Sequence, residues 1–432
     1  MRPIDEESLL ALEGSRLADT FTVWAYKGGK LVLPEPLEVL NWTSSDEAGE
    51  TVKIGHKMTL TVADPEGKLG AWKLDDPLGV AGTQLWLVYR VGGAGAVNFA
   101  RLKVVGNEPD EMTESREVDE YGYDKPDSPL GPHKIIKYAT KAVVRLEAVD
   151  ITLDVGDDRF EAPESPGPGA TIISEFRRLT EDHFPVVVDP GVVDRPVART
   201  LVFDREKLEA CQDLASRISA RYRMGGDGEC HIYPRNSDPV WTVEPNRSLV
   251  SVKRKQSITG LYNRWVVTGK DSGDGTPVKA AASIESGPLM YDGDHKRRPY
   301  FYNSEMIENY GQALAYAIEL REQFLASLAV ELTIQTVPWP QGQSGDRILI
   351  GCPVKEGHVA YFPAEVTRIG RRGSPTPSET TITASVSYAD VVAALGRTEW
   401  AQHITGVMPE LTWDRMPGNW GTLPPITWNN LP

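Results

Sequence analysis

Short stretches of alternating hydrophobic and polar residues dominate the first part of the chain. Residues 21–26 alternate, a Gly28–Gly29 turn follows, and residues 30–33 resume the pattern. Runs of the same kind recur at 52–62, 85–91 and 97–105. A period of two indicates β-strands. Short strands separated by glycine turns are typical of a closed or nearly closed barrel rather than of a parallel sheet.

Residues 108–134 interrupt this pattern with many Glu, Asp, Pro and Gly residues, and a strand-like run returns at 143–155. A stretch of this composition between two strands is typical of a long loop, which a neighbouring protein could order. The sequence therefore predicts an N-terminal β-barrel domain, residues 1–155, that carries the long loop 108–134.

A change of period marks the middle of the chain. Residues 163–169 are a linker by their Pro and Gly content, and helical patterns follow. The first predicted helix places on one side Ile172, Phe176, Leu179 and His183. The second runs from Asp204 as N-cap to about Tyr222. Its predicted inward residues are Leu208, Cys211, Leu214, Ile218 and Tyr222. With a strand at 229–233, these helices predict an α+β peripheral insert over residues 156–245.

The strongest helical pattern of the chain covers residues 304–329 and follows a strand-rich stretch. Its predicted apolar side consists of Ile307, Tyr310, Leu314, Ile318, Arg321, Leu325 and Leu328. Strand patterns return at 330–337, 347–350, 358–369 and 380–387, and a short helix follows at 388–395. We expect residues 246–329 to form a strand-rich segment plus the long helix. Residues 330–396 then form a second β-barrel module, with strands taken from 246–270.

The last segment, residues 397–432, repeats the phrase Trp-x-x-(Met/Leu)-Pro three times. Its candidate binding residues are Trp413, Met416, Trp420, Leu423, Trp428 and Leu431. A proline at the end of each repeat prevents a continuous helix and favours extended geometry before it. Tryptophan is a favoured anchor of interfaces. We expect an extended C-terminal strap that binds another protein surface. Two other interpretations are that the indoles cover the protein's own barrels or stack on carbohydrate.

Composition and charge narrow the class of protein. The chain has 432 residues, 40% hydrophobic and 25% charged, and a net charge of -15. The acidic balance argues against a nucleic-acid clamp, which needs clustered Lys and Arg, but it would let DNA slide past. Cys211, Cys230 and Cys352 lack metal-site spacing, so we expect reduced core residues. The sequence has neither a signal-peptide pattern nor a long apolar run, which predicts a soluble, cytoplasmically made protein with no membrane partner.

Catalytic and metal motifs are weak throughout. The turn around Ser344 resembles a nucleophile elbow, but Asp346 stands where that motif needs glycine. Asp292, Asp294 and His295 could supply metal ligands, but the neighbouring Tyr, Lys and Arg residues favour a solvated loop. We therefore expect no catalytic residue, no metal and no cofactor, and no enzymatic activity.

Residues 62–82, with Asp64-Pro65 and Asp75-Asp76-Pro77, resemble the N-terminal barrel of minor tail proteins of long-tailed (siphovirus-type) actinobacterial phages. Further resemblances occur in the same order at 182–194, at 262–269 and at Gly345-Asp346. The resemblance implies a central baseplate hub at the tail tip: a homotrimer in which two β-barrel tube modules per chain form a pseudo-sixfold ring. The ring continues the tail tube and lets DNA pass through its lumen without specific binding.

The fold class implied is mainly β with α+β inserts, in which an insert and a long helix join the two barrels. The implied partners are the tail tube or a distal tail protein, and distal fibre or spike proteins. The implied location is the virion, at the tail tip, after assembly in the host cytoplasm. Two other functions stay open: a receptor- or cell-wall-glycan-binding tail module, and a tail-associated peptidoglycan hydrolase. We do not expect the hydrolase, because a strap occupies the place where many hub-type proteins carry a lytic domain.

Overall fold

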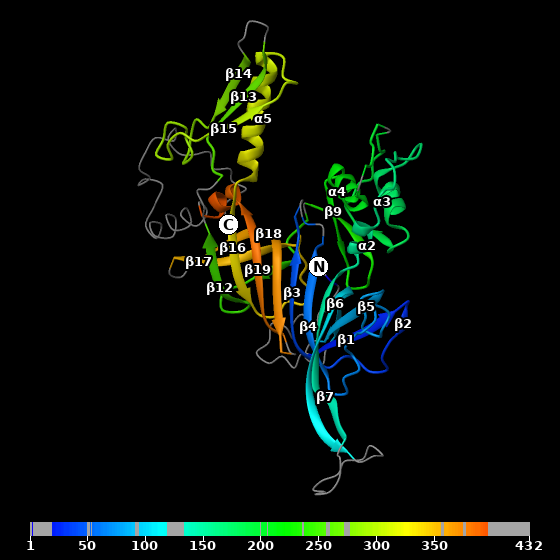
Figure 1. The fold of residues 1–432 in the computed structure, drawn as a ribbon. Coiled ribbons are helices and arrows are strands. Elements are labelled where there is room, and N and C mark those ends of the chain that lie inside the picture. Colours follow the sequence, from blue (N-terminus) through cyan, green and yellow to red (C-terminus); the bar gives the residue numbers. More distant parts are fainter. Residues whose placement is uncertain are drawn as a thin grey trace.

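The chain folds into one large sheet and two small ones (Figure 1). The computed structural model describes Arg2, Val52 and residues 20–49, 54–90, 95–118, 134–198, 200–204, 206–235, 237–255, 260–271, 277–355, 358–374 and 377–395. The predicted strap, residues 397–432, lies outside the described residues. The large sheet has thirteen strands and each small sheet has three, so the expectation of a mainly β fold with α+β inserts is confirmed.

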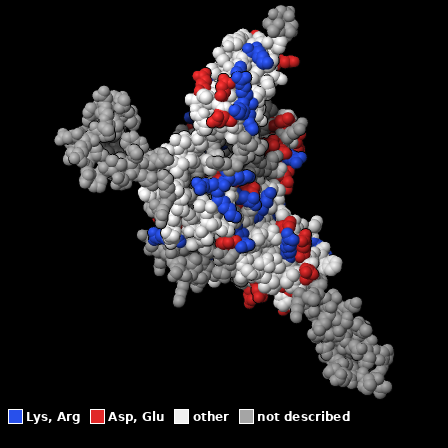
Figure 2. All heavy atoms as spheres, turned by 90° about the vertical axis from the view of Figure 1, so that its left-hand side faces the viewer, with Lys and Arg blue, Asp and Glu red and all other residues white. Residues whose placement is uncertain are grey.

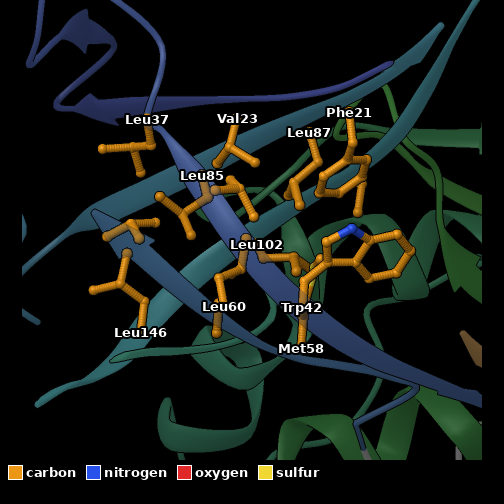
Figure 3. Close-up of a cluster of buried hydrophobic side chains, with 14 of the residues drawn as sticks. Phe21, Val23, Leu37, Trp42, Met58, Leu60, Leu85, Leu87, Leu102 and Leu146 are labelled. Carbon is orange, nitrogen blue, oxygen red and sulfur yellow. The ribbon is translucent and has the colours of Figure 1, made fainter. Parts of the chain in front are cut away.

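The first half of the large sheet comes from the N-terminal region. Its strands are β1 (Thr20–Lys27), β2 (Lys30–Leu31), β3 (Val39–Glu47), β4 (His56–Asp64), β5 (Thr83–Arg90), β6 (Ala96–Val118) and β7 (Lys134–Asp150). The spatial order is β3-β4-β7-β6-β5-β1-β2. Alternate residues point inward and build one hydrophobic core (Figure 3). Trp42 is one of its largest fully buried side chains, and its ring stacks on Phe21 at 4.6 Å between centroids.

The predicted loop 108–134 is in large part a β-ribbon, which corrects the sequence interpretation. Backbone pairing of β6 with β7 continues from Glu108↔Arg145 to Val118↔Lys134. Residues 119–133 lie outside the described residues. The ribbon extends away from the sheet (Figure 1). Main-chain hydrogen bonds to the partner strand hold such a ribbon, so a composition rich in Glu and Pro does not reveal it.

The second half of the large sheet comes mainly from the C-terminal region. Its strands are β11 (Trp241–Val243), β12 (Leu249–Lys255), β16 (Ala329–Thr336), β17 (Arg347–Lys355), β18 (His358–Gly373) and β19 (Pro377–Ser387). The expected insert 156–245 included β11, but β11 pairs in parallel with β17. The indole of Trp241 stacks on that of Trp339 at 4.6 Å. A run of three residues carries no periodicity from which its partner could be predicted.

The two halves are joined along one seam. The last residues of β18 pair with β19 on one edge and with β3 on the other, from Arg368↔Glu47 to Gly373↔Trp42. Among the described strands the path runs from β12 to β2 without closing into a ring. In the first half a single bridge, Val23↔Leu37, brings the stretch before β3 onto β1. We find no closed barrel among the described strands: the two barrel modules expected as closed or nearly closed share one continuous sheet. Alternation shows which face of a strand is buried but not its neighbour.

The insert contains α2 (Thr152–Asp157), α3 (Ile172–Thr180), β8 (Val186–Val188), α4 (Lys207–Arg217), β9 (Ala220–Met224) and β10 (Cys230–Pro234). Thr171 caps α3 in a reciprocal capping box with Ser174. The second predicted helix was too long: α4 ends at Arg217, and Tyr222 lies in β9. Ser219, with φ +54°, reverses the chain between them. His183 lies beyond α3, where its Nε2 is 2.9 Å from Asp158 Oδ2. Cys211 and Cys230 are free and buried in this core, and Cys352 is free and buried in the second half of the sheet.

A separate unit contains β13 (Arg264–Asp271), β14 (Pro277–Ser283), β15 (Pro299–Asn303) and the long helix α5 (Tyr310–Ser327). Of the strands expected from 246–270 in the second barrel, β12 joins the large sheet and β13 does not. Asn309 caps α5, since its side chain accepts a hydrogen bond from Gln312 N at 2.9 Å. None of the described helices combines the length and apolar character that crossing a membrane requires.

The buried side of α5 overlaps the predicted one only in part: Leu314, and Ile307 just before the helix, pack in the core of this unit as predicted. Ala313 and Ala317 are completely buried against the sheet. Tyr310, Ile318 and Leu325, from the predicted apolar side, remain 61%, 39% and 38% exposed. The periodicity of the larger residues is real, but the sheet lies closest to the alanines, whose small side chains allow close approach of the backbone. Among the described residues, the helix therefore keeps three large apolar side chains exposed beside its packed side.

Candidate functional site at the seam of the large sheet

Four charged or titratable side chains are buried together against the seam. They are Arg2, Asp46 of β3, His56 of β4 and Arg371 of β18. The ring of Phe99 from β6 lies beneath both guanidinium groups, 4.7 Å from Arg2 Cζ and 5.2 Å from Arg371 Cζ. Such cation–π contacts stabilise a buried cation.

The two arginines hold the turn between β16 and β17. Arg2 donates from its backbone N to Gln341 O at 2.7 Å and from Nη1 to Pro340 O at 3.1 Å. Arg371 Nη2 donates to Trp339 O at 3.2 Å and to Gly342 O at 2.6 Å. The planar guanidinium offers several donors in a fixed geometry, which suits it to gather backbone carbonyl groups. The N-terminus and β18 thus fix one turn from two directions.

Asp46 supplies the negative charge of this cluster. Its Oδ1 accepts a hydrogen bond from Ser344 Oγ at 2.6 Å, and its Oδ2 lies 3.7 Å from Arg2 Nη2. Burial acts to raise the pKa of Asp46, but His56, the cations Arg2 and Arg371 and the hydrogen bond from the Ser344 hydroxyl together bring this pKa below its usual value. Asp46 is therefore an anion at neutral pH. Ser344 is buried and donates to this anion, so it is a structural residue rather than an accessible nucleophile.

Burial changes the acid–base behaviour of the remaining groups. It lowers the pKa of Arg2 to about 10 and that of Arg371 to about 9. It lowers the pKa of His56 to about 3, against the attraction of Asp46. At neutral pH the cluster consequently contains two cations, one anion and a neutral imidazole. Truncation of one partner would leave the others buried without compensation.

The insert closes onto the same place. Arg223 of β9 donates from Nη1 to Asp346 Oδ1 at 2.8 Å, and its Cζ lies 4.3 Å from the Tyr233 ring centre. A Cβ at Gly345 would lie 2.1 Å from Tyr233 Oη, so the insert and the turn before β17 touch closely. A Cβ at Gly226 would lie 1.7 Å from Asn98 O in β6. The insert therefore contacts both halves of the sheet.

A cavity of about 340 Å³ lies between the insert and the seam. Its wall contains basic and acidic side chains, among them Arg101, Arg221, Arg223, Asp150 and Glu209. Burial raises the pKa of Asp150, while hydrogen bonds from His56 N and the Thr152 hydroxyl and N oppose this rise. A wall of mixed charge favours no single ligand. We interpret the cavity as part of the interface between the insert and the two halves of the large sheet.

The residues predicted as a binding site lie outside the described part of the chain. These are Trp413, Met416, Trp420, Leu423, Trp428 and Leu431. The loop with Asp292 and His295 agrees with the interpretation of a solvated loop. Asp292 Oδ1 pairs with Arg297 Nη2 at 2.7 Å, and His295 Nε2 lies 3.3 Å from Leu261 O.

Asp227, Glu229 and His231 form a group that sequence reasoning did not single out. One ligand atom from each lies within 4.8 Å of the others. His231 Nδ1, however, is 3.0 Å from Asp189 Oδ1, and its Nε2 is 3.4 Å from Asp227 Oδ2. Both ring nitrogens are engaged with carboxylates, and the group is on the surface. We assign no metal to it.

Sequence reasoning also missed the buried charges of the seam. One signal could have found Asp46, because Trp42, Ser44 and Asp46 occupy the buried phase of one alternating strand. A carboxylate in the inward phase of a strand needs a buried partner. Arg2 carried no comparable signal, since nothing in its neighbourhood is periodic.

Comparisons with known proteins agree on the fold. No family model matches the chain, and no curated protein matches it in sequence. The prophage MuSo2 43 kDa tail protein from Shewanella oneidensis matches 85% of this chain and 99% of its own, at 11% identity and a TM-score of 0.52. A tail protein from Neisseria meningitidis MC58 matches 87% and 99%, at 12% identity and a TM-score of 0.50.

A chain of the half-lidded Francisella PdpA–VgrG complex also shares the architecture. It matches 88% of this chain and 60% of its own length, at 9% identity and a TM-score of 0.50. At these identities the likeness concerns the fold. This chain has the fold of phage and prophage tail proteins, which is also present in a VgrG complex.

Proposed function

We propose that this chain is a structural protein of a phage tail: the central hub of the baseplate at the tail tip. In this proposal three copies form a ring that continues the tail tube and anchors distal fibre or spike proteins. The observation that carries it is the continuous sheet through both halves of the chain, in a fold shared over most of its length with two tail proteins. The resemblance of residues 62–82 to actinobacterial phage proteins adds the siphovirus-type setting.

The seam gives the proposal its physical basis. Backbone pairing of β18 with β3 makes the two halves one wall, so three chains would supply six sheet segments to a ring. The described path of the sheet ends at β12 and at β2. Unpaired edges of this kind are available to a neighbouring subunit, and head-to-tail contacts of identical chains close into a ring when the rotation permits.

Positively charged side chains on β12 favour a selective contact with an acidic partner at this edge of the sheet. Lys253, Arg254 and Lys255 of β12 are consecutive and exposed. Figure 2 shows Lys and Arg side chains gathered over the middle of the face that includes this part of the sheet. A charged edge strand resists indiscriminate pairing. A partner at this edge would present carboxylates, which the net charge of -15 supplies in excess. The same acidic balance suits a lumen through which DNA passes without being held.

Measurement of mass and shape tests the hub directly. Light scattering of the purified chain should give three times the chain mass of 47.6 kDa, and with its tube partner the complex should contain three copies of the chain. Electron microscopy of the complex should show a ring coaxial with the tube. A chain that stays monomeric with its partner and is absent from virions would contradict the proposal. Its presence in virions would also distinguish a phage tail from a secretion spike of VgrG type.

A glycan-binding tail module is the second candidate, and one exposed residue favours it. Trp72 is 90% exposed, and its turn is held by Asp76 Oδ2, which accepts from Trp72 N and Lys73 N at 2.8 Å each. An exposed indole on a turn that is held in this way can stack on a sugar ring. Pull-down with host cell-wall glycan decides between the candidates. Loss of binding in Trp72→Ala, or in the strap variants Trp413→Ala, Trp420→Ala and Trp428→Ala, with normal assembly would favour this module.

We also propose that the chain has no hydrolytic activity. The one serine with a motif-like setting, Ser344, is buried and bonded to Asp46. Zymography on host cell walls checks this. A lytic band that disappears after substitution of a single carboxylate would contradict it.

A further inference from the structure

We propose that the tryptophan-rich strap, residues 397–432, binds along the exposed apolar side of α5. We call this side the α5 stripe. It consists of the exposed Tyr310, Ile318 and Leu325 and the half-buried Leu314 and Leu328, of which Leu314 also packs on the core beneath the helix. The proposal goes beyond the hub function, and its tests are independent of ring formation. It names the surface that receives the strap.

The first support is the division of apolar residues on α5. The helix packs on its sheet through the buried Ala313 and Ala317 and through the partly buried Leu314, Tyr316 and Leu320. Tyr310, Ile318 and Leu325 stay exposed beside this contact. Stabilisation grows with the apolar area removed from water. Spacings of three, four and seven place the residues of the α5 stripe on one side of the helix. The stripe is about 27 Å long, at 1.5 Å per residue. An apolar side this regular and this open is suited to an additional layer.

The second support is the path of the chain. Ala329, just after α5, pairs with Ser387 at the end of β19. The next residue, Tyr388, donates from its backbone N to Leu328 O at 2.9 Å. The helical turns at residues 388–395 therefore start at the C-terminal end of the α5 stripe, as Figure 1 shows. Tyr388, Val392 and Leu395 are exposed there and continue the apolar surface. The described residues end at Leu395, near the C-terminal end of the α5 stripe, and the strap follows directly in the sequence.

The length of the strap and the chemistry of its side chains suit it to bind the α5 stripe. Residues 396–412 can span up to about 56 Å when extended, so Trp413 can reach any point of the α5 stripe, on its own chain or on a neighbouring one. Three indoles, each with a Met or Leu companion, offer the anchors that a shallow apolar surface requires. The prolines keep the segment from forming a helix of its own, which leaves these side chains available for a partner surface.

Protease protection in the full-length chain tests the proposal from the side of the stripe. Trypsin should cleave slowly after Arg397 and Arg415, which flank and enter the repeats. The double variant Ile318→Glu, Leu325→Glu should accelerate cleavage about tenfold, which corresponds to a loss of roughly 1.4 kcal/mol of binding. Both positions are exposed, so the fold should survive, and circular dichroism verifies this. The matched control is Glu322→Gln, an exposed residue of the same helix outside the stripe. Equal cleavage rates in all three proteins would overturn the proposal.

A cysteine reporter on the α5 stripe tests the proposal in a second way, through substitutions in the strap. The three native cysteines are buried, so Leu325→Cys provides a single accessible thiol for alkylation. Replacement of Trp413, Trp420 and Trp428 by alanine should raise its alkylation rate about tenfold, again the equivalent of roughly 1.4 kcal/mol. Protection that persists in this variant and grows with protein concentration would show that a second α5 stripe is the occupant, and protection that requires another tail protein would show a foreign one. Either result overturns the proposal. Added reporter-free chain should protect the tryptophan-free reporter if the strap acts between chains.

Discussion

The hydroxyl oxygen of Ser344 lies 2.6 Å from Oδ1 of Asp46, although the two residues are 298 positions apart in the chain. Asp46 belongs to β3, and Ser344 belongs to the turn before β17. The contact therefore spans the seam between the two halves of the sheet, beside the Arg2 guanidinium. Because this side-chain network is buried, it can be disrupted by single substitutions that leave the rest of the surface unchanged.

Arg2→Ala should lower the free energy of unfolding by about 3 kcal/mol, the size expected when one partner of a buried ion pair is removed. Asp46 would lose a cation, and the carbonyl groups of Pro340 and Gly342 would lose a donor. Chemical denaturation measures the change, and Lys30→Ala, on the surface of the first half, is the control. Arg2→Lys should fall between the two, because an ammonium group keeps the charge but not the planar fork. If Arg2→Ala and Lys30→Ala unfold alike, Arg2 does not hold the seam.

His56 should make the protein less stable in mild acid. Burial lowers its pKa from 6.5 to about 3. Between these values the unfolded chain binds a proton that the folded chain does not, so stability falls as pH decreases from about 6.5 towards 3. The slope from this group approaches 1.4 kcal/mol per pH unit. Above pH 6.5 the histidine is neutral in both states and contributes no slope.

Thermal unfolding of His56→Gln against the natural sequence isolates this effect. The raised pKa of Asp150 acts in the opposite direction, since the folded chain then binds the extra proton, but it is common to both proteins. The variant should show a shallower loss of stability between pH 6.5 and 4.5 than the natural sequence does. Parallel curves for His56→Gln and the natural sequence would contradict the assignment.

Replacement by alanine of two tryptophans in the first half of the sheet should change the stability of the protein by very different amounts. Trp42→Ala should cost about 3–5 kcal/mol, because it removes one of the largest fully buried side chains from a close-packed core. Trp72→Ala should leave the unfolding midpoint nearly unchanged, because its indole is exposed. Urea unfolding compares the pair. A stable Trp42→Ala would mean that the core of Figure 3 relaxes to fill the space.

Sequence patterns located most strands but did not predict their partners. Alternation identified the runs that became β1, β5 and β6, because it reports which residues face a core. The seam depends on backbone hydrogen bonds between β3 and β18, and these carry no residue signature. The β6–β7 ribbon was interpreted as a loop for the same reason. For α5 the periodicity was correct, but the packed side follows Ala313 and Ala317, whose importance lies in their small size rather than in hydrophobic pattern.

Gly226→Ala should weaken the attachment of the insert. A side chain at this position would collide with the backbone carbonyl of Asn98, which cannot move without disturbing β6. We expect a loss of about 1–3 kcal/mol, typical of overpacking, and faster proteolysis of the insert. Gly167→Ala is the control, since its Cβ would meet nothing within 4 Å. Identical digestion patterns for the two variants would show that the turn yields without cost.

The seam also fixes an order of events during synthesis. Arg368 Nε donates to Ser45 Oγ across 323 positions, so at 5–20 residues per second β3 waits roughly half a minute on the ribosome before β18 exists. During that interval β3 is an unpaired edge of a nearly complete sheet. Its end reads Thr43-Ser44-Ser45-Asp46-Glu47, and polar and acidic residues discourage pairing with a foreign strand. The residues that later join the halves thus also protect the nascent chain from aggregation.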